Sequence, residues 1–331
     1  MKALVYSGPK KITFKDVPEP ESCMDDILVK IDAVGICGSD MHAYLGHDER
    51  RPAPLILGHE ASGEVLEGAL KGKKVVINPL VTCGACRACL SGRANLCPHR
   101  EIISMPPRQG AFAEMIRIPE RNTLQIPENL GIHLAALAEP LATSWHAVVL
   151  AGRHMNRPIP ECHALVIGSG AVGLGAALVL RAFGCSRVMV AETNSLRRST
   201  AEKAGFNDTL NPSEDIKKPN KMVDLVIDAV GNKQTREFGI NRVNPGGVIV
   251  HIGLSDGEDG LDARKLTLQE VSLVGSYTYT PMDFGSTLDA MATGRLGSLD
   301  WAEIRKLEEG PAAFEDLLAG RASAAKIILS N

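Results

Sequence analysis

Four closely spaced cysteines have the most readily assigned chemistry in this 331-residue chain. Cys83, Cys86 and Cys89 form a CxxCxxC pattern, and Cys97 follows a short distance later. Four thiolates so close together suit one tetrahedral Zn2+ with no open coordination position, which is the arrangement of a structural site. Two disulfides or four unrelated thiols are the alternative, which the reducing interior of a cell disfavours. The stretch 83–97 therefore predicts a zinc lobe that does no chemistry itself.

A second set of potential metal ligands lies on either side of this lobe in the sequence. Cys37 and the neighbours His59 and Glu60 precede it, and Glu139 follows it. A thiolate, an imidazole and one carboxylate leave a fourth position for water or substrate, as a catalytic zinc requires. Each residue alone is ordinary, because a lone cysteine is usually part of a hydrophobic core. Only the combination predicts a catalytic zinc site.

A glycine-rich turn is the third chemical signal. Gly168, Gly170 and Gly173 form GxGxxG between a predicted strand and a predicted helix. Glycines so placed allow a tight turn, close approach of the backbone to a pyrophosphate, and close packing of the helix on the strand. Glu192 ends the next predicted strand, where a carboxylate can accept hydrogen bonds from the adenosine ribose. The alternative is a glycine-rich turn with a surface glutamate.

The charge of Glu192 also bears on the choice of nicotinamide cofactor. A carboxylate at this place repels a 2′-phosphate, so we expect NAD rather than NADP. Arg197 and Arg198 follow closely in the sequence and leave NADP open as the less favoured cofactor.

The secondary-structure pattern changes near residue 145, which predicts two parts that position these residues. Before it, short alternating segments between glycines and prolines predict a β-rich part with strands at 1–6, 12–17, 27–34, 61–66, 74–77 and 112–118. From residue 164 on, strands alternate with helices, which demands a parallel sheet with helices on both faces. The predicted strands are 164–167, 188–191, 225–229, 248–252 and 271–275, and the helices between them are 171–183, 196–204 and 233–243. Helices at 283–293 and 312–319 and a strand at 326–329 complete the pattern.

Composition limits the class of protein and of partner. A chain of 331 residues is long enough for two domains. Its 36 Lys and Arg against 39 Asp and Glu, a net charge of −3, argue against nucleic acid and anionic membranes and favour a small-molecule partner. The N-terminal segment does not have the pattern of a signal peptide, and apolar runs such as 176–180 fall far short of the roughly 18 residues of a membrane span, so we expect a cytoplasmic protein. Cys23, Cys162 and Cys185 have no evident partner and are predicted to be buried small hydrophobic residues.

Five segments in this order resemble the zinc-dependent medium-chain dehydrogenases of the alcohol dehydrogenase superfamily. They are GICGSD at 35–40, GHEASGEV at 58–65, the CxxCxxC lobe, AEPL at 138–141 and GSGAVG at 168–173. The resemblance spans essentially the whole chain. It implies an α/β protein with a GroES-like β-rich catalytic domain, residues 1–143 and 281–331, and an inserted Rossmann domain with a doubly wound parallel sheet, residues 144–280. The active site would lie in the cleft between them.

The resemblance also implies the roles of the metal-binding residues. Cys37, His59 and Glu139 would hold the catalytic zinc, with Glu60 ligating it transiently or through water. Asp40 would fix the ring of His59. Together with the lobe, this makes two zinc ions per chain.

Proton and hydride transfer follow from the same resemblance. Zinc would lower the pKa of a bound alcohol, Ser39 would accept its proton, and a ribose hydroxyl of the cofactor and His42 would pass the proton to solvent. The hydride then goes to the nicotinamide of NAD, whose chemistry belongs to the cofactor. Cofactor contacts are expected from the GxGxxG glycines and the residues that follow, namely Ala171, Val172, Glu192, Arg197, Gly253, Leu254 and Tyr277.

With a glutamate, Glu139, rather than a cysteine as the expected third zinc ligand, the chain resembles the polyol branch of this family, which includes sorbitol and idonate dehydrogenases. Two departures are Ala43, where sorbitol enzymes have Tyr, and Thr278, where they have a substrate-binding Arg. A vicinal diol, a sugar acid or a phosphorylated polyol therefore stays open. Arg50, Arg51 and Arg108 could meet an anionic substrate, but solvated surface charge is the favoured interpretation for each.

The predicted function is an NAD- and zinc-dependent dehydrogenase of a secondary alcohol, working as a homodimer or homotetramer. L-Threonine 3-dehydrogenase and galactitol-1-phosphate dehydrogenase-like activities are alternatives. The zinc-free quinone reductase branch lacks the lobe and the ligands found here. A non-catalytic NAD(H)-binding protein on the same fold is a further alternative, but such a chain should have lost ligands or relay groups, and all are present.

Overall fold

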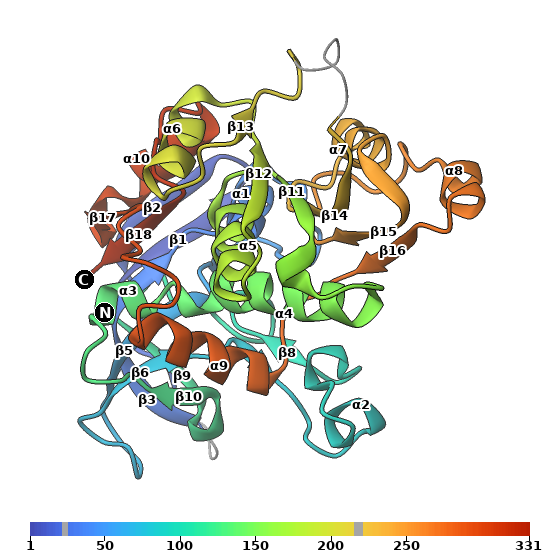
Figure 1. Ribbon diagram of the computed structural model, residues 1–331. Coiled ribbons are helices and arrows are strands. Elements are labelled where there is room, and N and C mark those ends of the chain that lie inside the picture. Colours follow the sequence, from blue (N-terminus) through green and yellow to red (C-terminus); the bar gives the residue numbers. More distant parts are fainter. Residues whose placement is uncertain (22–25, 215–220) are drawn as a thin grey trace.

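The computed structural model describes residues 1–21, 26–214 and 221–331, and Figure 1 shows the course of the chain. Cys23 lies outside the described residues, so the expectation for it concerns a residue the structure does not describe. Cys162 and Cys185 are 1% and 2% exposed, which confirms the prediction that they are buried.

The first part of the chain forms a seven-stranded sheet in the order β10-β6-β5-β3-β18-β17, with β9 also paired to β3. Its strands are β3 (Asp26–Gly35), β5 (Glu60–Val65), β6 (Lys74–Ile77), β9 (Met115–Pro119), β10 (Thr123–Gln125), β17 (Ala302–Lys306) and β18 (Lys326–Ser330). A second sheet joins β1 (Lys2–Gly8), β2 (Lys11–Asp16) and β4 (Leu55–Ile56), while β7 (Leu80–Val81) pairs with β8 (Glu101–Ile102). Strands β17 and β18, near the C-terminal end, therefore complete a sheet whose other strands lie between residues 26 and 125.

Strand β3 is the centre of this sheet. It pairs antiparallel with β5, β9 and β18. Its alternating residues Val29 and Ile31 are fully buried in the core of the β-rich part, which is the period-2 pattern expected of a strand with one face on a core. The end of β3 leads directly into Cys37, so the best-supported strand of the sheet positions the first candidate metal ligand.

The second large sheet has six parallel strands in the order β13-β12-β11-β14-β15-β16. The strands are β11 (His163–Ile167), β12 (Arg187–Ala191), β13 (Thr209–Leu210), β14 (Val223–Asp228), β15 (Val243–His251) and β16 (Ser272–Gly275). The intervening helices are α5 (Ala171–Ala182), α6 (Ser195–Lys203), α7 (Lys233–Ile240) and α8 (Ala263–Leu268). This confirms the predicted doubly wound parallel sheet. The strand order reverses between β11 and β14, which is where such sheets bind ligands.

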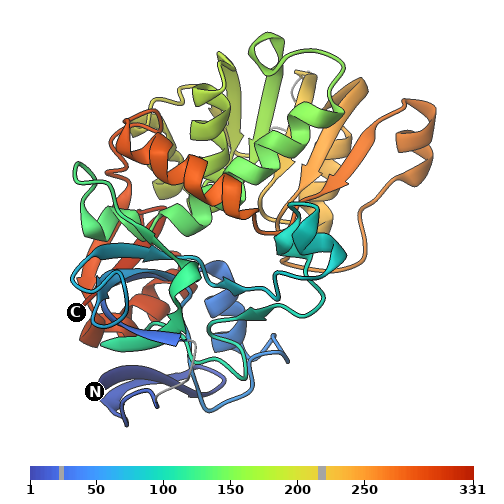
Figure 2. The same cartoon turned by 90° about the horizontal axis from the view of Figure 1, so that it is seen from below.

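Two helices pack between the sheets. Figure 2 shows the parallel strands in the upper half and the N-terminal strands in the lower half of the molecule. Helix α4 (Ala138–His154) packs against α5 and against α9 (Pro281–Ala292). A buried pair joins α4 to α9, with 2.8 Å between His146 Nδ1 and Asp283 Oδ2. The predicted domain boundaries, at 143 within α4 and at 281 where α9 begins, stay a prediction.

The β-rich interpretation of the first 145 residues missed helices. The structure has α1 (Gly38–Leu45), α2 (Arg87–Leu90), α3 (Ile132–Ala135) and the start of α4 in this part. Near the other end, α10 (Gly310–Leu318) confirms the helix predicted at 312–319. Helix α4 is hidden from pattern analysis because most of its residues are buried, so no polar face marks its period. The helix predicted at 233–243 ends earlier, at Ile240, because Val243 already belongs to β15. Among the described residues, the helices are too short or too polar to span a membrane.

Helix α10 closes the core of the β-rich part. The ring of Phe314 is fully buried, 5.1 Å from that of Tyr44 and 5.9 Å from that of Phe112 between centroids. We predict that Phe314→Ala lowers the free energy of unfolding by about 3–5 kcal/mol, because the truncation leaves a cavity. Leu318→Ala, on the same helix but 46% exposed, is the control and should cost less than about 0.5 kcal/mol. Equal urea midpoints for the two variants would contradict the prediction.

Candidate active site

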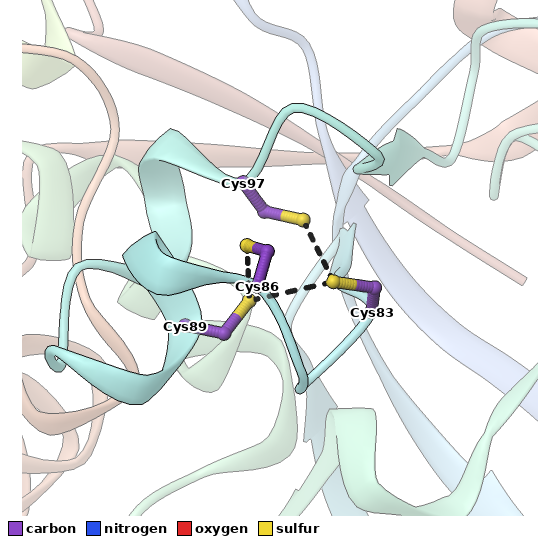
Figure 3. A group of neighbouring side chains, drawn as sticks. All are labelled: Cys83, Cys86, Cys89 and Cys97. Carbon is purple, nitrogen blue, oxygen red and sulfur yellow. Dashed lines mark hydrogen bonds between the residues drawn. The ribbon is translucent and has the colours of Figure 1, made fainter.

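The four cysteines of the lobe come together as predicted from their spacing. Figure 3 shows their side chains around one centre, and their sulfur atoms all lie within 4.8 Å of one another. Gly84 and Gly92 have φ values of 72° and 76°, so glycine provides the left-handed turns of the lobe. Helix α2 begins directly after Cys86.

The chemical state of these sulfurs suits a metal ion. All four cysteines are free thiols in the structure. The backbone amides of Ala85 and Cys86 lower the pKa of the Cys83 thiol to about 6, which favours the thiolate that binds metal, whereas burial and the neighbouring Cys86 raise the pKa of Cys89 to about 11. Four converging sulfurs fit a tetrahedral Zn2+. The structure contains no disulfide among these four cysteines.

The second cluster brings together Cys37, His59 and Glu60, whose ligand atoms also lie within 4.8 Å of one another. Cys37 is the N-cap of α1, and His59 and Glu60 stand at the start of β5. Strand pairing of Gly35 with Glu60 brings these two segments together. His59 and Glu60 are 7% and 0% exposed. Of the two glutamates considered from the sequence, Glu60 is therefore the one that joins the thiolate and the imidazole.

This cluster fits a metal ion because one of its buried oxygens is unsatisfied. Glu60 Oε2 is buried and has no hydrogen-bond partner, which costs free energy unless a cation or donor completes it. Burial alone would lower the pKa of His59, but the Asp40 carboxylate and the Cys37 thiolate raise it well above its ordinary value. The cluster thus attracts positive charge, as a site for a divalent cation should.

Asp40 is fully buried beside this cluster and connects its parts. Its Oδ2 accepts the backbone N–H of Cys37 at 2.9 Å, and its Oδ1 accepts that of Gly58 at 3.2 Å. Its Oδ1 lies 3.6 Å from Nδ1 of His59, which is beyond a direct hydrogen bond. Burial alone would raise the pKa of Asp40, but His59 and Arg51 keep it lowered, so the carboxylate is ionised.

Glu139 lies near this cluster but has a partner of its own. The hydroxyl of Tyr279, a fully buried residue, donates to Glu139 Oε1 at 3.0 Å. Burial and the negative charge of Glu60 raise the pKa of Glu139 to about 7, although His59 lowers it. Tyr279 is a site residue that the sequence analysis missed. It follows the predicted Tyr277 by two positions and is stacked on Phe284, 5.2 Å between ring centroids.

The predicted relay residues share helix α1. Ser39 and His42 lie three residues apart, so their side chains are neighbours on one helix face. Burial and the charge of His47 lower the pKa of His42, which keeps its imidazole neutral near pH 7 and able to accept a proton. Arg51 Nη2 lies 3.5 Å from the hydroxyl oxygen of Ser39.

Arg51 corrects one expectation from the sequence. It is 3% exposed and not a solvated surface charge, because its guanidinium binds Asp48 at 2.5 Å and the carbonyl oxygen of Ser104 at 3.1 Å. Arg50 is 60% exposed and also pairs with Asp48. Arg108 is mostly buried and pairs with Asp26 at 2.7 Å and with Glu101 at 2.6 Å, so it too is no solvated surface charge. Arg108 is thus paired with two carboxylates, whereas Arg50 and Arg51 share the single carboxylate of Asp48.

The glycine-rich turn shows which glycine serves the fold and which serves a ligand. A Cβ on Gly173 would lie 2.0 Å from the carbonyl oxygen of Gly168, so the first turn of α5 packs too closely on β11 for any side chain. Gly168 itself has a φ of 92°. A Cβ on Gly170 would meet nothing within 4 Å, so the fold does not require glycine there. The open space over Gly170 suits the close approach of a pyrophosphate.

Glu192 stands beside this turn and is held in place. Oε2 of Glu192 accepts hydrogen bonds from the backbone N–H of Ser169 at 2.9 Å and from the Ser169 hydroxyl at 3.1 Å. Oε1 of Glu192 accepts a hydrogen bond from the backbone N–H of Asn194 at 2.9 Å. The guanidinium of Arg198 donates to the carbonyl oxygens of Glu192 and Thr193. A cavity of about 700 Å3 opens here, lined among others by Gly168, Glu192, Val230, Asn232 and Phe238.

The remaining predicted cofactor residues are found in several places. Ala171 and Val172 form the first turn of α5, and Arg197 lies on α6 with its Nε buried and unpaired. Gly253 packs against the backbone of Val230, and Leu254 is 71% exposed. Tyr277 lies beneath Arg100, 4.9 Å from ring centroid to guanidinium carbon, and its carbonyl oxygen accepts a hydrogen bond from Asn95 of the lobe.

Comparison with known proteins gives the family. Residues 24–128 match the alcohol dehydrogenase GroES-like domain, and residues 171–293 match the zinc-binding dehydrogenase domain. The chain is 33% identical to L-galactonate-5-dehydrogenase of Escherichia coli, with 89% of this chain and 88% of that protein covered. It is 32% identical to sorbitol dehydrogenase of Bacillus subtilis, covering 84% of this chain and 82% of that protein. The solved structure of galactitol-1-phosphate dehydrogenase from Escherichia coli superposes with a TM-score of 0.88 at 25% identity, and the match covers 100% of both chains.

The two glycines of the turn give a paired test. We predict that Gly170→Ala leaves the melting temperature nearly unchanged but weakens NADH binding about tenfold or more, because the added Cβ occupies the open space and keeps the pyrophosphate from charge-assisted hydrogen bonds to the backbone, each worth about 1.5–3 kcal/mol. Gly173→Ala should instead lower the melting temperature, because its Cβ collides with backbone. NADH titration by fluorescence and thermal melting separate the two effects. Unchanged NADH affinity in Gly170→Ala would contradict the assignment.

The lobe can be tested by removing one sulfur. We predict that Cys89→Ser loses one zinc ion per chain and melts at a lower temperature, because a structural zinc contributes folding free energy. Ser91→Ala is the control, since its exposed hydroxyl bonds only the carbonyl of Ala88 within the same lobe. Zinc counted by mass spectrometry and melting curves are the readouts. A Cys89→Ser protein that keeps its zinc and its melting temperature would refute the role of the lobe.

Proposed function

Since the chain belongs to the zinc-dependent alcohol dehydrogenase family, we propose that it oxidises a secondary alcohol of a polyol or sugar acid to the ketone, with NAD as the hydride acceptor. The observation that carries this proposal is the buried cluster of Cys37, His59 and Glu60 with its unsatisfied carboxylate oxygen. The enzyme acts on CH–OH donors and uses zinc and a nicotinamide cofactor, as its family does.

We assign the catalytic metal site to Cys37, His59 and Glu60, and a second zinc to the four cysteines of the lobe. Zinc, when bound at the first site, supplies a Lewis acid that lowers the pKa of the substrate hydroxyl. Asp40 orients the two loops that carry the ligands, because it binds the backbone of Cys37 and of Gly58. The prediction that Glu139 is the third ligand stays a prediction. The hydrogen bond that Glu139 accepts from Tyr279 favours a position for this carboxylate beside the bound substrate or water.

The chain's own residues can carry the proton away. Ser39 would accept the proton of the substrate hydroxyl, and the neutral imidazole of His42, one helical turn further along α1, would pass it to solvent. The lowered pKa of His42 supports this role, since a protonated imidazole could not accept a proton near pH 7. Both residues are present together with the ligands, which disfavours a non-catalytic NAD(H)-binding protein.

NAD is the proposed cofactor and NADP the less favoured one. The carboxylate of Glu192 is fixed by Ser169 and Asn194 and cannot easily turn away from the ribose. A 2′-phosphate would meet this negative charge. The guanidinium of Arg198 is engaged by two backbone carbonyls, which reduces what it could offer to a phosphate.

A neutral polyol is favoured over a phosphorylated substrate. Arg108, which could have met a substrate anion, is paired with Asp26 and Glu101, and Arg50 and Arg51 both bind the one carboxylate of Asp48. A sugar acid is supported by the similarity to L-galactonate-5-dehydrogenase, and a phosphorylated polyol by the similarity to galactitol-1-phosphate dehydrogenase. L-Threonine remains a further alternative from the sequence.

The proposed assembly is a homodimer or homotetramer joined through the parallel sheet. Strand β16 ends the strand order of this sheet within the described residues, so one edge has no partner strand there. Leu273 on β16 is 40% exposed and Leu268 of the preceding helix is 67% exposed. An uncovered edge with apolar side chains is suited to pairing with a second copy.

The function is tested by following NADH formation with sorbitol, xylitol, galactitol, L-idonate, L-galactonate, 2,3-butanediol, L-threonine and galactitol 1-phosphate. We predict turnover of one polyol or sugar acid by the zinc-loaded protein, and no measurable turnover by Cys37→Ser, because it lacks a metal ligand. Cys162→Ala is the matched control, since Cys162 lies before β11, at the end of that strand opposite to the glycine turn. Wild-type rates in Cys37→Ser, or no oxidation of any alcohol by zinc-loaded protein, would refute the proposal.

A further inference from the structure

Lys326 is a buried lysine at the start of the last strand, and only 4% of it is exposed. Its Nζ donates to Glu60 Oε1 at 2.6 Å and to the carbonyl oxygen of Ile36 at 2.8 Å. A buried ammonium group is costly unless it is paired and hydrogen-bonded, so this place is well defined. Both partners adjoin the candidate catalytic metal site, since Ile36 precedes Cys37 and Glu60 follows His59.

The order of strands explains how Lys326 reaches Glu60. Strands β5 and β18 lie on either side of β3 in the sheet. Glu60 on β5 pairs with Gly35 on β3, and Ile328 on β18 pairs with the same Gly35 from the other side. The backbone N–H of Ile36 also donates to the carbonyl oxygen of Ile327 at 2.9 Å. Lysine and glutamate from the outer strands therefore meet across the end of the middle one.

Gly35 leaves the space in which this contact forms. A Cβ at position 35 would lie 2.1 Å from Glu60 Oε2 and 3.2 Å from the carboxyl carbon of Glu60. Gly35 does not have a positive φ, so its backbone conformation does not require glycine. The glycine is required by the carboxylate that lies over it. The Glu60 side chain is thus held by Lys326 at one oxygen and given room by Gly35 at the other.

The two oxygens of Glu60 have different environments as a result. Oε1 is occupied by the ammonium group of Lys326, whereas Oε2 is buried without a partner and belongs to the side chain that converges with Cys37 and His59. Rotation of the carboxylate would exchange the two oxygens but would leave one of them on Lys326. One oxygen of Glu60 therefore always stays free of Lys326 and available to a metal ion. The positive charge of Lys326 also offsets the negative charges of Glu60 and Cys37.

We infer that Lys326 is a positioning residue for the catalytic metal: by holding one oxygen of Glu60, it presents the other as the third ligand beside Cys37 and His59. This inference rests on the proposed zinc-dependent function. Lys326 acts through Glu60 and does not contact the substrate. Its distance from Glu60 in the sequence, 266 residues, explains why no local motif indicates it.

The test measures zinc affinity in Lys326→Met, Lys326→Arg and Lys30→Met by competition with a chromophoric chelator. We expect Lys326→Met to weaken binding at the catalytic site about 10- to 100-fold, the usual loss when a residue that orients a ligand is removed. Lys326→Arg should recover most of the affinity, because a guanidinium can also donate to Glu60. Lys30→Met removes the charge of an exposed lysine on β3 and should bind zinc like wild type. The Co2+-substituted proteins should show altered visible bands in Lys326→Met alone.

A double-mutant comparison separates positioning from a purely structural role. If Lys326 acts through Glu60, the zinc affinity of Glu60→Gln should not fall further when Lys326→Met is added. Additive losses, or wild-type zinc affinity in Lys326→Met, would overturn the inference. Should Lys326→Met alone fail to fold, Lys326→Arg at wild-type affinity would support the inference, and a further loss of affinity from Glu60→Gln to the double variant would overturn it.

The readout is independent of alcohol oxidation. A wild-type protein that binds the second zinc but oxidises none of the alcohols would refute the proposed function and leave the inference on Lys326 to be decided by the affinities. A wild-type protein that binds zinc only at the lobe would overturn the inference itself.

Discussion

Mutual neutralisation of buried charges is the constraint on which this molecule depends. Asp40, His59, Glu60 and Lys326 are each at most 7% exposed and share one small region at the end of β3. An isolated buried charge is too costly to keep, and each of these groups is tolerated because another one, or a backbone N–H, lies against it. Asp40 binds backbone on two loops, and Lys326 binds both Glu60 and a carbonyl oxygen. The strands must therefore take this register, or several ionised groups would be left unpaired.

A short connection also ties the same region to the nucleotide-binding sheet. Residues 276–283 run from β16 to the first turn of α9 and make three contacts in succession. The carbonyl oxygen of Tyr277 accepts a hydrogen bond from Asn95 of the zinc lobe at 2.9 Å, the hydroxyl of Tyr279 binds Glu139, and Asp283 pairs with His146 on α4. The four-cysteine lobe thereby braces the segment that carries Tyr279 against Glu139. This gives the lobe a part in the geometry of the site.

The extent to which the sequence predicted the site follows the separation of its residues along the chain. The four lobe cysteines and the GxGxxG turn were predictable, because each group lies within a few residues and its spacing alone restricts the geometry. The parallel sheet was predictable because alternating strands and helices have few ways to pack. The burial of Arg51, the bond from Tyr279 to Glu139 and the contact of Lys326 with Glu60 were not, since each depends on strands or loops that meet only in the fold. A pattern of residue types cannot show whether Glu60 or Glu139 lies closer to Cys37, because that depends on the three-dimensional packing of the segments.

The place of β18 beside β3 has a consequence for the synthesis of the protein. A chain leaves the ribosome from its N-terminus, and its domains generally fold as they emerge. Here Cys37, His59 and Glu60 are made early, but the lysine that faces Glu60 arrives 266 residues later, after the whole parallel sheet has been translated. Until β18 has been made, the backbone N–H and C=O groups of β3 that pair with β18 have no partner strand. The early thiolate and imidazole are thus present in the nascent chain well before the environment that holds them in place.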